Sequence, residues 1–112
     1  MTLVVVDAVG LTPRVLKHMP RVAKLGADGF SAALDPIVPA VTCSVQATFT
    51  TGLTPTGHGI VGNGWYFRDL GEVLLWRQHN KLVQGEKVWE TARRSKPGYR
   101  AANLCWWYAM GA

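Results

Sequence analysis

The hydrophobic positions of the chain fall into short runs that are separated by glycine and proline. Leu3–Val6 is an unbroken aliphatic run, which is typical of a strand buried on both faces of a parallel sheet. Gly29–Leu34 and Tyr99–Trp106 are two further runs of strand length. Trp65–Arg68 and Glu72–Trp76 lie on either side of three turn residues, a pattern that predicts a β-hairpin.

Between these runs the polar pattern predicts helices. Thr12 followed by Pro13 predicts an N-cap and a short first helix, and Met19–Gly26 predicts a second one that starts with a proline. A third helix is expected from about Cys43 to Thr51, and a fourth over Gln84–Arg94, with apolar residues on one side. Strands alternating with helices and one hairpin indicate an α/β fold.

Composition narrows the class of protein. The 112 residues are 48% hydrophobic and only 17% charged, enough for one small folded domain. The net charge of +5 favours anionic partners, but the basic residues are scattered, so specific nucleic-acid binding is not expected. No signal peptide or bilayer-length apolar run occurs, which predicts a cytoplasmic protein without membrane contact. Cys43 and Cys105 are expected to be reduced and buried.

Two residues stand where chemistry is possible. Thr42 comes directly before the third helix, where it could cap the helix or present its hydroxyl to an anion held by the free N–H groups. Asp7 follows the first apolar run, and ligands gather at the carboxyl ends of strands in open α/β sheets. Taken singly, the capping interpretation of each residue is the simpler one.

Several segments together resemble one family. The run ending in Asp7, the segment Pro39–Thr42, the motif within Thr51–Ile60 and the block Val61–Asp69 are similar to the amino-terminal part of an alkaline phosphatase superfamily enzyme. The nearest branch is the type I phosphodiesterase/nucleotide pyrophosphatase group. The resemblance covers essentially the whole chain, and it implies an alkaline-phosphatase-like sheet flanked by helices, with a β-hairpin insertion.

The resemblance also implies roles for individual residues. Asp7 and Thr42 would be ligands of one metal ion, Thr42 would be the nucleophile, and Asn63 would contact a phosphoryl oxygen. These roles suit the side chains, because a threonine hydroxyl needs activation that a bound Zn²⁺ can supply. Asn63 could donate to the developing charge on phosphorus oxygens, although an ordinary turn asparagine remains the alternative. The expected reaction proceeds through a phosphothreonine intermediate, with two zinc ions in the full-length enzyme.

The chain departs from the family in its length. The family's other metal ligands are aspartates and histidines of a longer chain, whereas His18, His58 and His79 here stand in no ligand motif. His58 is interpreted as a loop histidine bonded to backbone. Residues 1–112 are therefore expected to be an incomplete amino-terminal portion of a single catalytic domain, carrying the nucleophile half of the site and inactive alone.

Alternatives remain open on sequence grounds. The predicted substrate is a small phosphodiester or nucleotide, but a phosphonoacetate-hydrolase-like enzyme or another phosphoryl hydrolase of the superfamily would share the nucleophile segment. A small basic, aromatic-rich nucleic-acid-binding module is the alternative of another class, since tryptophans can stack on bases. The sequence leaves the substrate, the metal identity and the oligomeric state undetermined.

Overall fold

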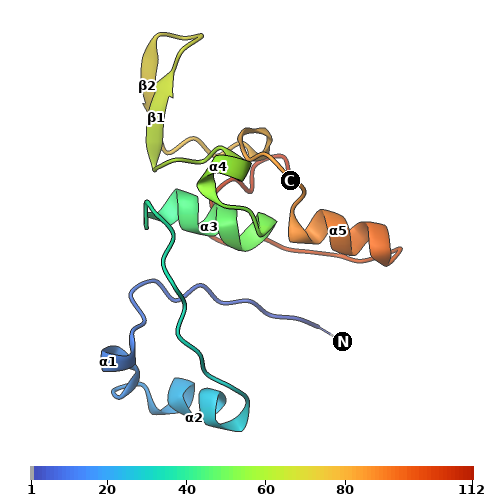
Figure 1. The fold of residues 1–112 in the computed structure, drawn as a ribbon. Coiled ribbons are helices and arrows are strands. Elements are labelled where there is room, and N and C mark those ends of the chain that lie inside the picture. Colours follow the sequence, from blue (N-terminus) through green and yellow to red (C-terminus); the bar gives the residue numbers. More distant parts are fainter. Residues whose placement is uncertain (1) are drawn as a thin grey trace. The chain divides into compact units, whose positions relative to one another are not determined.

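The structure is a computed structural model that describes residues 2–112. The chain divides into two compact units, with the boundary between Asp35 and Pro36. Helices and a two-stranded antiparallel sheet make up the regular structure (Figure 1). The α/β class predicted from the sequence is thereby confirmed.

The first unit contains two short helices, α1 (Pro13–Leu16) and α2 (Pro20–Asp28). Each begins with proline, which suits the first helical position because its missing N–H would have had no partner there. Thr12 caps α1 as predicted, its Oγ1 accepting a hydrogen bond from the Val15 N–H at 3.3 Å. No residue of either helix is buried.

The apolar runs of the first unit are not strands. Leu3–Val6 is extended but unpaired, and its side chains are 71–78% exposed. The run over 29–34 is likewise irregular and exposed. A β-strand requires hydrogen-bonded neighbours, and the only ladder formed by the described residues lies in the second unit. The two predicted strands are therefore wrong for this chain.

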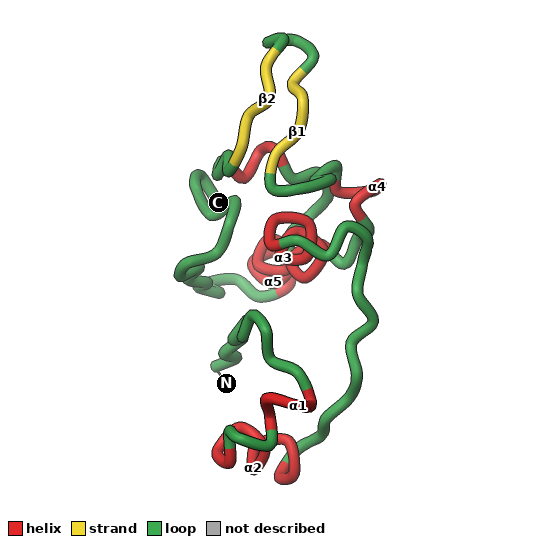
Figure 2. The backbone as a smooth tube through the Cα atoms, turned by 90° about the vertical axis from the view of Figure 1, so that its left-hand side faces the viewer, coloured by secondary structure: helices red, strands yellow, loops and turns green. Residues whose placement is uncertain are grey.

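The second unit is built around α3 (Thr42–Thr51), followed by the short helix α4 (Pro55–His58) (Figure 2). The predicted helix after Val41 is confirmed to within one residue. Gly52 ends it in the left-handed conformation, with φ +70°, and its N–H bonds to the Thr48 carbonyl at 2.8 Å. Glycine suits this position because it has no Cβ to clash.

The predicted hairpin is present as β1 (Gly64–Phe67) and β2 (Glu72–Leu75). The strands are antiparallel, with Gly64 opposite Leu75 and Trp65 opposite Leu74. Figure 1 shows the hairpin projecting from the end of the unit near α4. Trp65 and Phe67 share one face of the hairpin, and their rings stack with centroids 5.0 Å apart.

The remaining elements are η1 (Asn80–Leu82) and α5 (Val88–Ser95). The helix predicted from Gln84 starts later because Gly85 is left-handed, with φ +81°, and Lys87 is the N-cap residue. The Lys87 N–H donates to Glu90 Oε2 at 2.8 Å. The predicted strand Tyr99–Trp106 is wrong: this segment is irregular, without a strand partner among residues 2–112.

The core of the second unit gathers side chains from well-separated segments. Its buried members come from α3, the loop after α4, the end of η1 and the carboxyl-terminal segment: Cys43, Ala47, Ile60, Val83 and Tyr108. Trp65, Leu82 and Trp107 pack against this cluster and are half-buried. This core fixes the first turn of α3, where the predicted nucleophile lies. No helix within residues 2–112 has both the length and the apolar character to cross a bilayer.

Candidate functional site

The start of α3 is capped from a distance. Its N-cap residue, Val41, has no polar side chain to accept from the free N–H groups of the first turn. Asn63, 20 residues downstream, takes this role: its Oδ1 accepts a hydrogen bond from the Cys43 N–H at 3.0 Å. This is one of the two N–H positions that an N-cap side chain normally binds. The predicted site residues Thr42 and Asn63 are therefore brought together at one helix end.

The hydrogen bond also sets the orientation of the Asn63 carboxamide. A backbone N–H is a donor, so the atom facing it has to be the oxygen, and the amide nitrogen Nδ2 faces the other way. Nδ2 therefore keeps its two N–H donors for another acceptor. Asn63 is half-buried, and the backbone holds it from the other side, where the Trp76 N–H donates to the Asn63 carbonyl at 2.8 Å.

Thr42 is the first residue of α3. It is half-buried, and its hydroxyl forms no hydrogen bond with any residue in the described range 2–112. The capping role that the sequence favoured for Thr42 belongs to Asn63 instead. The Thr42 hydroxyl lies beside the positive end of the helix dipole and next to the N–H groups of the first turn, an environment that favours negative charge.

Asp7 lies in the first unit, at the end of the extended run and just before a turn in which the Leu11 N–H bonds to the Ala8 carbonyl at 3.1 Å. Its side chain is half-buried. Its predicted role as a ligand shared with Thr42 remains a prediction.

His58 is fully buried, and both ring nitrogens are engaged. Nδ1 accepts from the Ile60 N–H at 3.0 Å, so Nε2 carries the proton of the neutral ring and donates to Thr48 Oγ1, also at 3.0 Å. Burial lowers the pKa of His58 below its usual value, because the charged form would lose its hydration. The predicted bond from His58 to backbone is confirmed, but the residue ends helix α4 rather than lying in a loop.

Next to Thr42 in the sequence, Cys43 is buried in the core together with Tyr108, and the two side chains interact. Burial raises the pKa of the Cys43 thiol, and the contact with Tyr108 opposes this only in part. Burial likewise raises the pKa of Tyr108, and the contact with Cys43 adds to the increase. Both groups are therefore neutral packing groups. Cys105, in contrast, is exposed, so the prediction that both cysteines are buried is wrong for Cys105.

Two buried amide side chains attach the carboxyl-terminal segment to this site. Gln46 Oε1 accepts from the Trp107 N–H at 2.9 Å, and Asn80 Nδ2 donates to the Tyr108 carbonyl at 3.0 Å. Sequence reasoning missed both residues, since nothing in the local pattern around either one points to a partner 28 or more positions away. The side chains thus hold Tyr108 against Cys43 and support the first turn of α3.

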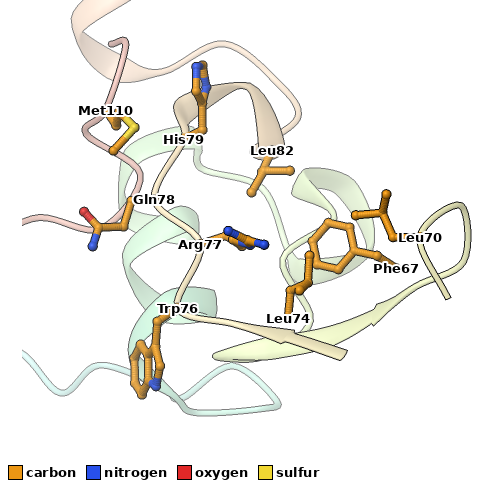
Figure 3. Close-up of a pocket in the computed structure, with 9 residues that line it drawn as sticks. All are labelled: Phe67, Leu70, Leu74, Trp76, Arg77, Gln78, His79, Leu82 and Met110. Carbon is orange, nitrogen blue, oxygen red and sulfur yellow. The ribbon is translucent and has the colours of Figure 1, made fainter. Parts of the chain in front are cut away.

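A cavity of about 470 Å³ lies beside the hairpin, lined mainly by apolar side chains (Figure 3). The Arg77 side chain extends into it toward Phe67, Leu74 and Leu82, whereas the Trp76 and His79 rings point away. None of the predicted site residues lines this cavity. The Trp76 ring instead packs on Trp107, with centroids 5.0 Å apart.

Comparison with known protein families identifies the chain. The sequence model of the family described as type I phosphodiesterase / nucleotide pyrophosphatase matches residues 3–112. The chain belongs to this family. The match spans Asp7, Thr42 and Asn63, and it confirms the resemblance noted in the sequence. No solved structure shows significant similarity to the chain.

Membership in the type I phosphodiesterase/nucleotide pyrophosphatase family indicates a hydrolase of phosphodiester or nucleotide pyrophosphate bonds. The family's chemistry takes place on a phosphorus centre that carries negative charge. The polarised end of α3, with its aligned N–H groups and the Asn63 amide, matches that requirement. Within residues 2–112, no three His, Cys, Asp or Glu side chains gather closely enough to hold a metal ion.

Proposed function

We propose that this chain carries the nucleophile half of a metal-dependent phosphodiesterase or nucleotide pyrophosphatase site, with Thr42 as the nucleophile. The observation that supports this most is the bond from the Cys43 N–H to Asn63 Oδ1. It holds a side-chain amide at the helix N-terminus whose first residue is Thr42, with the amide's own donors directed elsewhere. An attacking oxygen and donors for a phosphoryl oxygen then stand side by side.

The proposed reaction is an in-line displacement. Thr42 Oγ attacks phosphorus, the bond from phosphorus to the leaving oxygen breaks, and the substrate's phosphoryl group becomes an ester of Thr42. Water then attacks the same phosphorus and releases Thr42. Asn63 Nδ2 donates to a non-bridging oxygen in both steps, where charge develops. A neutral donor of this kind contributes about 10²–10³ in rate at comparable sites.

The metal requirement fits the side chains only in part. Asp7 and Thr42 supply one carboxylate and one hydroxyl oxygen, and an aspartate oxygen is a known ligand of Zn²⁺. A bound divalent cation would favour the ionised form of the Thr42 hydroxyl at neutral pH. Two ligands are fewer than the four that zinc usually takes, which agrees with the proposal that further ligands lie outside this chain.

The nucleophile is tested by a matched pair of substitutions in an enzyme that contains this segment together with the remaining ligands. Thr42→Ala removes the attacking oxygen and should abolish hydrolysis of bis(4-nitrophenyl) phosphate. Thr42→Ser keeps a hydroxyl and should retain measurable turnover. Acid-quenched enzyme should carry the phosphoryl adduct on residue 42, detected by peptide mass spectrometry. Full turnover of Thr42→Ala, or full turnover after chelation of divalent cations, would contradict the mechanism.

The incompleteness of the site is tested on the 112-residue chain itself. Calorimetric titration with Zn²⁺ should show only weak binding at Asp7 and Thr42, and hydrolysis of the diester should be undetectable. The double variant Asp7→Asn, Thr42→Ala serves as the control for adventitious binding elsewhere. Tight, stoichiometric binding that this control abolishes, or hydrolysis by the chain alone, would show a complete small enzyme.

A further inference from the structure

Packing determines the residue at position 64. An added Cβ at Gly64 would lie 2.3 Å from Leu75 Cδ2 and 2.8 Å from the Leu74 carbonyl oxygen, both on the opposite strand of the hairpin. Contacts this short do not occur between real atoms, and one of them is to backbone, which cannot move away easily. The hairpin therefore accepts only glycine at its first position.

Capping determines the residue at position 63. Its side chain has to reach the Cys43 N–H with an oxygen, which the asparagine amide does. The two requirements place asparagine directly before glycine. In an Asn-Gly sequence the glycine nitrogen meets little steric hindrance when it attacks the neighbouring side-chain carbonyl. This is the intramolecular step of spontaneous deamidation.

The attacking nitrogen is not held by the hairpin. The Trp76 N–H bonds to the Asn63 carbonyl, which makes Asn63 and Trp76 a hydrogen-bonded pair at the base of the strands. Hydrogen-bonded and non-bonded pairs alternate along an antiparallel ladder, so the next pair, Gly64 with Leu75, is non-bonded. The Gly64 N–H accordingly points away from β2.

The carbonyl under attack is activated. When a nitrogen adds to Asn63 Cγ, negative charge collects on Oδ1, and this oxygen already accepts from the Cys43 N–H at 3.0 Å. A donor is therefore already bonded to the oxygen on which the charge collects, and the positive end of α3 adds to the stabilisation. Nδ2, the leaving nitrogen, faces away from the helix.

We infer that Asn63-Gly64 is a site of self-catalysed deamidation, in which the N-terminus of α3 stabilises the oxyanion. The Gly64 nitrogen gives its proton to solvent, the N–Cγ bond forms and the Cγ–Nδ2 bond breaks. Nδ2 leaves as ammonia after taking a proton from solvent. Water then opens the succinimide at either carbonyl and leaves an aspartate or an isoaspartate at position 63. The net reaction consumes one water and releases one ammonia.

The two products differ in their effect on the site. An aspartate keeps an oxygen for the Cys43 N–H, and its charge suits a helix N-terminus, so α3 stays in place. An isoaspartate lengthens the backbone by one methylene before β1 and displaces the hairpin. Both products lack the Nδ2 donors. The deamidation chemistry does not depend on the proposed hydrolase activity, because it needs only the described contacts and water.

The inference is tested by ageing the 112-residue chain at mildly alkaline pH, followed by peptide mapping with mass spectrometry. Asn80 and Asn103 are the internal comparisons, and a synthetic peptide of residues 61–67 gives the rate without α3. We expect deamidation at Asn63 to exceed that at Asn103 by at least about tenfold. We also expect the rate in the folded chain to be no lower than in the peptide.

A second experiment tests whether the loss of the amide at residue 63 requires attack by the Gly64 nitrogen. The variant Asn63→Gln lengthens the side chain so that attack by Gly64 would need a larger ring, and its residue 63 should remain intact over the same period. The inference would be overturned if Asn63 deamidated about tenfold or more slowly in the folded chain than in the peptide. That result is expected if the strand is rigid and no donor stabilises the oxyanion. Equal rates at Asn63 and Asn103 would overturn it as well.

Discussion

The two units of the chain contrast in how their apolar residues are used. In the first unit, Leu3–Val6 forms the most strand-like run of the sequence, yet it is exposed and unpaired. In the second unit, Cys43, Ile60 and Tyr108 come from separate segments, yet they are buried together in the core. Hydrophobic sequence alone does not produce structure, because a strand needs a neighbouring strand, whereas a helix satisfies its own backbone.

The two units also differ in the polar contacts that their side chains make. In the first unit Lys24 pairs with Asp28 at 2.8 Å, and this contact is exposed and spans one helical turn, so it contributes little to stability. The second unit joins distant segments through the buried or half-buried side-chain hydrogen bonds of Gln46, Asn63 and Asn80. If stability resides in the second unit, substitutions there should lower it more than matched substitutions in the first unit.

The largest expected difference in unfolding free energy is between truncations of one aliphatic side chain in each unit. Ile60→Ala removes a fully buried side chain and should lower the free energy of unfolding by about 2–5 kcal/mol. Val5→Ala, at a residue 71% exposed, should change it by less than about 0.5 kcal/mol. Urea denaturation followed by circular dichroism measures both. Equal losses would mean that the first unit has a core of its own.

The next effect is a dependence on pH. The pKa of His58 is lowered by folding, so the unfolded state binds the proton more readily and stability falls as pH drops. The loss begins below the unfolded value of about 6.5 and continues toward the lower folded pKa. Protonation of Nδ1 deprives the Ile60 N–H of its acceptor, a loss of about 1–3 kcal/mol.

Denaturation midpoints measured between about pH 7.5 and pH 5 check this prediction. The variant His58→Asn keeps an acceptor near the position of Nδ1 and should flatten the pH dependence over that interval. His18→Gln, at an exposed residue of the first unit, is the matched control and should retain the wild-type slope. An unchanged slope in His58→Asn would assign the effect to other groups.

A smaller difference in stability is expected between removal of the α3 cap, Asn63, and removal of the α1 cap, Thr12. Asn63→Ala removes the acceptor for the Cys43 N–H and should lower stability by about 1 kcal/mol, the usual cost of a lost N-cap. Thr12→Ala removes the cap of α1, which buries nothing, and should leave the main unfolding transition unchanged. A larger loss in Thr12→Ala than in Asn63→Ala would reverse the comparison of the two units.

The smallest effect concerns a buried hydroxyl. Ser44 Oγ is fully buried and has no hydrogen-bond partner among residues 2–112. Ser44→Ala removes this unsatisfied group and should raise stability by about 0.5–1 kcal/mol. Thr51→Ala is the control, since its hydroxyl donates to the Ala47 carbonyl at 2.7 Å and its loss should not stabilise. Destabilisation by Ser44→Ala would indicate that the hydroxyl is satisfied in solution.

Sequence reasoning succeeded where the determinants are local. Turn chemistry predicted the hairpin, the proline and threonine signals predicted the start of α1, and the segment after Val41 predicted α3 to within one residue. It failed at Leu3–Val6 and at Tyr99–Trp106, because strand formation depends on partners that an apolar run does not reveal.

The candidate site also has a part that the sequence predicts and a part that it does not. Thr42 and Asn63 could be named from sequence motifs. The hydrogen bond that brings Asn63 to the start of α3 could not be predicted, because its donor is the Cys43 backbone N–H and no residue type encodes it. The structure also changes the expectation for Asn63. An exposed turn asparagine would hardly affect stability, whereas this half-buried residue caps a helix.

The central claim is that Asn63 binds α3 through its oxygen and offers its nitrogen donors to the phosphoryl group at Thr42. The most direct measurement compares turnover and unfolding free energy for Asn63→Asp and Asn63→Ala in an active enzyme that contains this segment. Asn63→Asp keeps the acceptor but loses the donors, so stability should be retained while turnover falls about 10²–10³-fold. Asn63→Ala should lose both. Wild-type turnover in Asn63→Asp would contradict the account, since no donor would then be required at this position.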